Sequence, residues 1–315
     1  MTLAFASIIS GIALIWISAE KLEKYSVLAA KQFGMSPFFI GSTVIAFGTS
    51  APEMLTTFFV SLEDQGSMVI GNVIGSNVAN LSLVFGSMLF VVSIKKQNIS
   101  QPQSIIKNLL ILIASSLLVW CVIAVDPFNI MTSVILLIAL SVVITFWYRQ
   151  NTEMPNAEND NPSEKPFIRL ILSLVALVFA AWLITTGANL ILHKFSLGQL
   201  FIGYTVLAIG TSLPEIAASV SLALKSRYEA VAGTLIGSNI FNGLCVLAIP
   251  GLFRSNQMSS GWTYSEWSSL MVILFAITLL FCIYIFILSK QSRRASLLLS
   301  ILFLSIYFVS LIYAY

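Results

Sequence analysis

The stretches GSTVIAFGTSAPE (residues 41–53) and GYTVLAIGTSLPE (residues 203–215) are two copies of one pattern, identical at nine of thirteen positions. A second pair follows at the same offset of 162 residues. It reads GNVIGSNVAN at 71–80 and GTLIGSNIFN at 233–242, with six of ten positions identical. Each copy places one glutamate in an otherwise apolar run. Because a carboxylate is costly inside a membrane, two matched ones indicate a functional site.

The composition predicts a membrane protein. Hydrophobic residues make up 58% of the 315 residues and charged residues only 9%, whereas soluble domains carry about 25% charged residues. Because a membrane-crossing helix needs about 20 apolar residues, we expect an all-α protein with ten transmembrane helices. The apolar stretches are 3–19, 37–60, 67–93, 105–125, 128–148, 168–192, 199–224, 229–253, 267–289 and 295–314.

One long polar segment divides the chain. Residues 149–167 are rich in Pro, Asn and acidic residues, which is typical of a flexible linker. Five predicted helices precede it, in residues 1–148 (the first half), and five follow, in residues 168–315 (the second half). Each half carries one copy of both repeated motifs.

The distribution of basic residues predicts the topology. With ten crossings, fourteen of the sixteen Lys and Arg residues fall in the odd-numbered loops or at their edges, and only Lys194 and Arg254 fall in the even-numbered ones. The positive-inside rule therefore puts the odd loops and the linker in the cytoplasm and both termini outside. Because each half has an odd number of helices, the two halves form inverted repeats, the architecture of many secondary transporters.

The repeated glutamates predict a cation site. Of thirteen acidic residues, only Glu53 and Glu215 lie deep inside predicted helices, and neither motif contains Lys or Arg. A buried carboxylate there needs a cation or a proton, so we expect a bound cation, with a permanently protonated structural glutamate as the alternative. One His and three Cys exclude a His/Cys zinc cluster. An intramembrane hydrolase has no support, because the sequence shows no metal-ligating His pair or Ser/His arrangement.

The residues before each glutamate predict helix breaks at membrane depth. Proline lacks an N–H and disfavours helical geometry in the residue before it, and glycine adds backbone freedom. A break there would expose carbonyl oxygens, which is tolerated only where they line a site. The predicted break residues are Gly48, Pro52, Gly210 and Pro214.

The remaining polar residues of the motifs supply oxygen ligands. Thr49 and Glu53 are four residues apart and share a helix face, as do Ser76 and Asn80, and Asn77 adjoins Ser76. The second copy repeats these pairs as Thr211 with Glu215 and Ser238 with Asn242, and Asn239 follows Ser238. Such oxygens suit Ca²⁺ or Na⁺. The small-residue pairs Gly71/Gly75 and Gly233/Gly237 indicate close helix packing.

GTSAPE with GSNVAN, and GTSLPE with GSNIFN, resemble the two alpha repeats of the cation/calcium exchanger superfamily, in particular its prokaryotic sodium/calcium exchangers. The resemblance extends over the ten-helix layout and implies Na⁺/Ca²⁺ antiport by alternating access, with several Na⁺ per Ca²⁺. It also implies that helices one and six slide against the other eight. The alternatives left open are a Ca²⁺/H⁺ or K⁺-dependent exchanger of the same fold and a cation channel.

The resemblance also implies ligand roles. Glu53 and Glu215 become the central acidic ligands, with Thr49 and Thr211 beside them, and Asn80 and Asn242 line the midpoint. Ala46 and Ala208 offer backbone carbonyls, and the flanking Na⁺ sites are completed by Ser50, Ser76, Ser212 and Ser238. Some relatives carry Asp at the positions of Asn80 or Asn242, which puts potassium dependence in doubt here.

The same reasoning predicts no enzymatic activity and no cofactor. The expected substrates are Ca²⁺ and Na⁺, the surroundings a lipid bilayer, and the location a prokaryotic cytoplasmic (inner) membrane. Neither nucleic acid nor an obligate protein partner is indicated.

Overall fold

A computed structural model describes residues 2–32, 37–95, 105–150, 166–195, 197–224, 226, 228–253, 267–287 and 293–314. These residues are almost entirely helical, and no strand occurs within these ranges. Six long helices are regular. They are α1 (Thr2–Gln32), α6 (Ile105–Val125), α7 (Ile130–Gln150), α8 (Pro166–Phe195), α14 (Ser268–Ile287) and α15 (Arg293–Ala314).

Four further helical stretches are composite, because each contains a π-helical segment (η) with wider hydrogen-bonded turns. The first two are α2 (Pro37–Phe39), η1 (Ile40–Ile45) and α3 (Ala46–Leu62), then α4 (Gly66–Ala79), η2 (Asn80–Val84) and α5 (Phe85–Lys95). The other two are α9 (Gln199–Ile202), η3 (Gly203–Leu207) and α10 (Ala208–Leu224), then α11 (Tyr228–Phe241), η4 (Asn242–Val246) and α12 (Ile249–Phe253). The repeated motifs lie in these four stretches.

The helices are those of a multi-pass membrane protein. Within the described residues, seven are long and apolar enough to cross a bilayer, and two shorter apolar helices cover Thr2–Ser18 and Phe179–Ile191. The predicted stretch 37–60 is helical but does not belong to either group. Helix α1 continues well beyond the predicted end at residue 19. The predicted linker falls mainly on residues 151–165, which lie outside the described residues.

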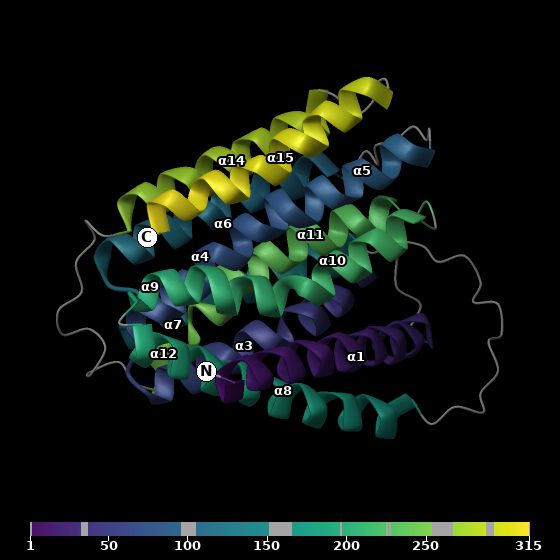
Figure 1. The fold of residues 1–315 in the computed structure, drawn as a ribbon. Coiled ribbons are helices and arrows are strands. Elements are labelled where there is room, and N and C mark those ends of the chain that lie inside the picture. The colour runs from purple at the N-terminus through teal and green to yellow at the C-terminus, as the bar shows by residue number, and fades with distance from the viewer. Residues whose placement is uncertain are drawn as a thin grey trace.

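The motif-bearing helices occupy the centre of the bundle. Figure 1 shows α14 and α15 on one flank and α1 and α8 on the other, with α4, α10 and α11 between them, and both chain ends at the same end of the bundle. In an apolar 18-residue segment of the central Ala230–Phe253 stretch, 83% of the residues are buried, against 22% in the corresponding segment of Ile130–Gln150. A central position removes the polar motif residues from lipid.

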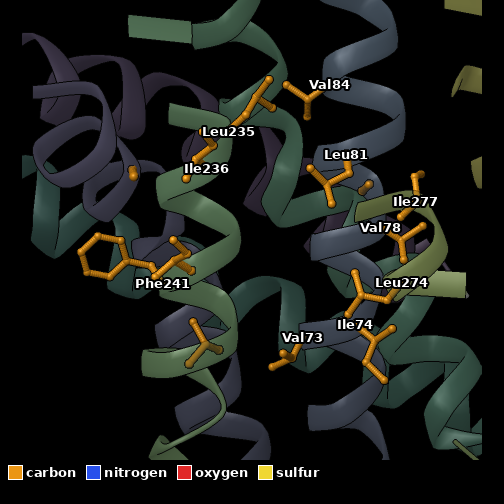
Figure 2. Close-up of a cluster of buried hydrophobic side chains, with 14 of the residues drawn as sticks. Val73, Ile74, Val78, Leu81, Val84, Leu235, Ile236, Phe241, Leu274 and Ile277 are labelled. Atoms are coloured by element: carbon orange, nitrogen blue, oxygen red, sulfur yellow. The ribbon is translucent and has the colours of Figure 1, made fainter. Parts of the chain in front are cut away.

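Helix α4 shows how the sequence sorts its two faces. Ile74 and Val78 are four residues apart and point toward Leu274 and Ile277 of α14 in the apolar cluster of Figure 2. Residues 72, 76 and 80 repeat with the same spacing on another face of the helix, and all three are polar. The apolar face therefore anchors α4 and leaves its polar face for the centre of the protein.

Candidate functional site

The structure buries every residue predicted to hold a cation. None of the twelve exposes more than 1% of its surface, although ten of them carry polar side chains or a charge. Asn77 and Asn239 are also buried, at 5% and 4% exposure. Buried polar groups normally require partners, so the hydrogen bonds of this cluster indicate what it can bind.

The two halves of the chain meet at the glutamates. Ser212 of the second half donates a hydrogen bond to Oε1 of Glu53 in the first half, at 3.4 Å. The carboxylates of Glu53 and Glu215 lie within electrostatic range of each other. The structure therefore brings together two carboxylates that are separated by 162 positions in the sequence.

A second contact between the halves joins Thr49 to Ser238. Their hydroxyl oxygens are 3.3 Å apart. The Thr49 hydroxyl faces the carbonyl oxygens of Ile45 at 3.0 Å and Ala46 at 3.3 Å, to which it donates its single proton. Either hydroxyl can donate in this contact, which links the first half of the chain to the second. Thr211 makes the equivalent bond within its own helix, to the Leu207 carbonyl at 2.9 Å.

Many oxygens in this cluster are unsatisfied. Both Glu215 carboxylate oxygens, Oε2 of Glu53 and the amide oxygens Oδ1 of Asn80 and Asn242 have no hydrogen-bond partner among the described residues. The same is true of the hydroxyls of Ser50 and Ser76. Leaving a buried polar group unpaired costs about 1–3 kcal/mol. A hard cation coordinated by carboxylate, amide and hydroxyl oxygens would satisfy this donor set, which contains neither sulfur nor imidazole.

Glycines allow the helices that carry the ligands to approach closely, as the small-residue pairs predict. A Cβ atom on Gly75 would lie 2.8 Å from both the Ala208 Cβ and the Tyr204 carbonyl oxygen. A Cβ atom on Gly237 would lie 2.7 Å from the Ala46 Cβ. Both distances are below van der Waals contact, so neither position accepts a side chain. At the first crossing Ala208 therefore packs on α4, which carries Ser76. At the second crossing Ala46 packs on α11, which carries Ser238.

The predicted helix breaks are wrong. Helix α3 continues through Gly48 and Pro52, and α10 continues through Gly210 and Pro214. Proline removes one backbone hydrogen bond, and close packing on neighbouring helices holds the rest of the turn. Pro52 nevertheless leaves the Gly48 carbonyl without its usual amide donor, and Pro214 does the same to Gly210.

The irregular backbone lies elsewhere, in π-helical segments that the sequence did not reveal. Segment η1 ends just before Ala46 and η3 just before Ala208, while η2 begins at Asn80 and η4 at Asn242. Segments of this kind inside α-helices occur frequently at functional sites. A π-helical turn has no distinctive composition, and the shared signal here is only that the segments repeat at the motif offset.

Comparison with known proteins shows which family this chain resembles. The family model described as "Sodium/calcium exchanger protein" matches residues 3–149 and 165–315. The inner membrane protein YrbG of Escherichia coli is 28% identical over 291 residues, 90% of this chain and 89% of the relative. The sodium/calcium exchanger MaX1 of Methanosarcina acetivorans is 23% identical over an alignment of 355 positions, which covers 90% of this chain and 99% of the relative.

A solved structure shares the fold. The sodium-calcium exchanger NCX_Mj, soaked with Na⁺ and Sr²⁺, superposes with a TM-score of 0.72 at 29% sequence identity. The match covers 98% of this chain and 97% of the other.

Proposed function

The chain belongs to the sodium/calcium exchanger protein family, and from that premise we propose that it exchanges Na⁺ for Ca²⁺ across a membrane through the site around Glu53 and Glu215. It is an antiporter and not an enzyme. The observation that best supports this function is the group of buried, unpaired carboxylate and amide oxygens at Glu53, Glu215, Asn80 and Asn242.

The charge of the site suits this pair of ions. Two carboxylates balance one Ca²⁺, and amide, hydroxyl and backbone oxygens complete a shell of six to eight ligands. We propose that Glu53 and Glu215 bind the central ion with Thr49, Thr211, Ala46 and Ala208, and that Asn80 and Asn242 line the midpoint. Flanking Na⁺ ions would bind at Ser50, Ser76, Ser212 and Ser238. With several Na⁺ exchanged per Ca²⁺, transport would be electrogenic.

We further propose that the helices form two inverted five-helix repeats, residues 1–148 and 168–315, joined by a cytoplasmic linker. Reciprocal contacts support this arrangement. Gly41 packs on Ala230, and the equivalent Gly203 packs on Met68, the counterpart of Ala230. An approximate two-fold relation between the halves produces such exchanged pairs.

Alternating access would come from a joint movement of α1 and α8, the helices named one and six above. A Cβ atom on Gly11 of α1 would lie 2.6 Å from Ile184 of α8, and a Cβ atom on Gly187 of α8 would lie 2.6 Å from Ile8 of α1. At the other end, Arg169 of α8 donates a hydrogen bond to the Tyr25 hydroxyl of α1 at 3.0 Å. These contacts support movement of the two helices as one unit.

The decisive experiment measures ⁴⁵Ca²⁺ flux in proteoliposomes with the Na⁺, K⁺ and H⁺ gradients varied separately. We expect Ca²⁺ flux driven by Na⁺ alone. Flux driven only by H⁺, or only when K⁺ is present, would replace this function with one of the alternative exchangers. Currents above the turnover of a carrier would indicate a channel.

Removing either carboxylate charge should stop transport. In Glu53→Gln and Glu215→Gln the side chain keeps its size, but one charge no longer balances Ca²⁺ in a buried site. Breaking a buried charge pair costs about 3–5 kcal/mol, so we expect flux to fall by roughly 100-fold or more. Glu20→Gln, at an exposed position on α1, is the matched control. Near-normal flux in either buried variant would contradict the assignment.

A further inference from the structure

A buried hydrogen-bond network joins α3 to α4 beside Glu53. Asn72 of α4 donates from Nδ2 to Oγ1 of Thr57 at 3.1 Å and to Oγ1 of Thr56 at 3.4 Å. All three side chains are completely buried. Oδ1 of Asn72 has no hydrogen-bond partner within the described ranges. An amide held this way fixes the position of α3 relative to α4.

The network continues to the backbone of Glu53. Oγ1 of Thr56 lies 2.9 Å from the Pro52 carbonyl oxygen and 3.1 Å from the Glu53 carbonyl oxygen, and donates to them. Because Thr56 accepts the hydrogen bond from Asn72 with a lone pair, its own hydroxyl proton remains available for these carbonyls. Chains of this kind strengthen each member by polarisation. The turn they stabilise follows the point where Pro52 removes a backbone hydrogen bond.

The location matters as much as the bonds. Asn72 and Ser76 are four residues apart on α4, and Glu53 and Thr57 are four residues apart on α3. Residues with this spacing lie on the same helix face, one turn apart. The Asn72–Thr57 bond therefore sets the spacing of the two helices one turn away from Glu53 and Ser76.

Among the described residues of the second half, no equivalent network forms. Ala218, Ser219 and Thr234 occupy the positions of Thr56, Thr57 and Asn72. Thr234 donates to the Ala230 carbonyl of its own helix at 2.9 Å. The Ser219 hydroxyl has no hydrogen-bond partner in the part of the chain that the structure describes. Ala218 has no hydroxyl with which to hold Glu215.

We propose that Asn72 is a positioning residue for Ca²⁺ binding, acting through Thr56 and Thr57 to hold Glu53 at a fixed distance from Ser76. The inference rests on the proposed function, because it needs Glu53 as an ion ligand. Glu53 is then held in place by hydrogen bonds from residues that do not bind the ion, and Glu215 has no equivalent hydrogen bonds among the described residues. A network with a structural role alone would stabilise the fold and leave the affinity for Ca²⁺ unchanged.

The test compares KM and maximal rate for Ca²⁺ in full-length protein reconstituted in liposomes. Asn72→Ala and Thr56→Ala should raise KM by about tenfold, the effect of losing one buried hydrogen bond. The maximal rate should change by less than about threefold, because the charges of the site remain. Thr56→Ser keeps the hydroxyl and should restore the KM of the unsubstituted protein. Ser219→Ala, which removes the unpaired hydroxyl of the second half, should leave KM unchanged.

A second measurement separates positioning from folding. In detergent, Ca²⁺ should raise the Tm of the unsubstituted protein by mass action, and the Asn72→Ala variant should need about tenfold more Ca²⁺ for the same shift. A lower Tm with an unchanged KM and an unchanged Ca²⁺ response would overturn the proposal. Glu53→Gln separates the two hypotheses. If that variant is inactive while Asn72→Ala binds Ca²⁺ normally, only the positioning role fails. If Glu53→Gln transports normally, the proposed function fails.

Discussion

At the scale of single residues, Glu53 and Glu215 are equivalent in sequence and different in surroundings. Glu53 accepts a hydrogen bond from Ser212, whereas both oxygens of Glu215 are unpaired among the described residues. The flanking hydroxyls differ as well, since Thr49 contacts Ser238 across the halves at 3.3 Å. The two halves therefore supply the same ligand residues, but the hydrogen bonds that hold these residues differ between the halves.

The amides at the midpoint set the charge of the site. Asn80→Asp would add a third carboxylate to a buried cluster that already holds two, and like charges at close range favour protonation of one of them. We therefore expect Ca²⁺ flux in this variant to depend more steeply on pH than in the unsubstituted protein. Lowering the pH would protonate the added group and return the site to two charges, so flux should recover toward acid pH.

Initial rates of ⁴⁵Ca²⁺ flux between pH 6 and 9 would check this expectation. Asn129→Asp, on the exposed turn before α7, is the control. Its side-chain oxygen accepts a hydrogen bond from the Met131 amide at 2.8 Å, and aspartate keeps this acceptor. Identical pH profiles for Asn80→Asp and the unsubstituted protein would show that residue 80 does not face the transported ion.

The site residues could be predicted because their motifs occur twice in the sequence. The role of Asn72 could not, because this residue is not repeated. The glutamates, threonines and serines stood out because they occur twice at one offset, and the structure buries all of them together. Asn72, Thr56 and Thr57 are replaced by Thr234, Ala218 and Ser219 in the second copy. Their contacts depend on how α3 packs on α4, and a single sequence carries no record of that packing.

At the scale of helices, hydrophobic length was predictable and backbone irregularity was not. The predicted stretches 105–125 and 199–224 coincide with helical limits in the structure. Pro52 was interpreted as a helix break, yet α3 continues through it. Local rules give the cost of proline in an isolated helix, and tertiary packing can exceed that cost. The π-helical segments also depend on packing, so no local sequence pattern predicts them.

The crossing of α4 with η3 and α10 offers a test of helix packing. Gly75→Val would place side-chain atoms where the Ala208 Cβ and the Tyr204 carbonyl oxygen already lie, each 2.8 Å from the added Cβ. The helices must separate, which moves the neighbouring Ser76 away from the other half. Overpacking of this kind costs about 1–3 kcal/mol, so we expect a lower Tm and roughly tenfold weaker Ca²⁺ affinity.

Thermal unfolding in detergent and Ca²⁺-dependent flux would measure both effects. Gly198→Ala is the matched control, because no atom of the described residues, apart from its chain neighbours, lies within 4 Å of a Cβ at that position. Unchanged Tm and affinity in Gly75→Val would mean that the crossing is looser than the structure indicates.

At the scale of the whole molecule, the two halves share even their turns. Asp64, between α3 and α4, and Ser226, between α10 and α11, are separated by the motif offset of 162 residues. Both have positive φ angles, of 57° and 60°, although neither is glycine. This backbone conformation is uncommon outside glycine, so its occurrence at equivalent positions extends the relation between the halves beyond the repeated motifs.

The same two turns test the inverted topology. If the halves are inverted, Asp64 faces the outside and Ser226 the cytoplasm, although their local structures match. In a variant without the native cysteines, Asp64→Cys should react with a membrane-impermeant maleimide added to intact cells, and Ser226→Cys should react only after the membrane is opened. Both positions are exposed, so labelling reports the side of the membrane and not burial. Labelling of both from the same side would make the repeats parallel. In parallel repeats the equivalent ends of both motifs would face the same compartment. The site could then not offer equivalent ligands to the two sides of the membrane, as a carrier built from inverted repeats does.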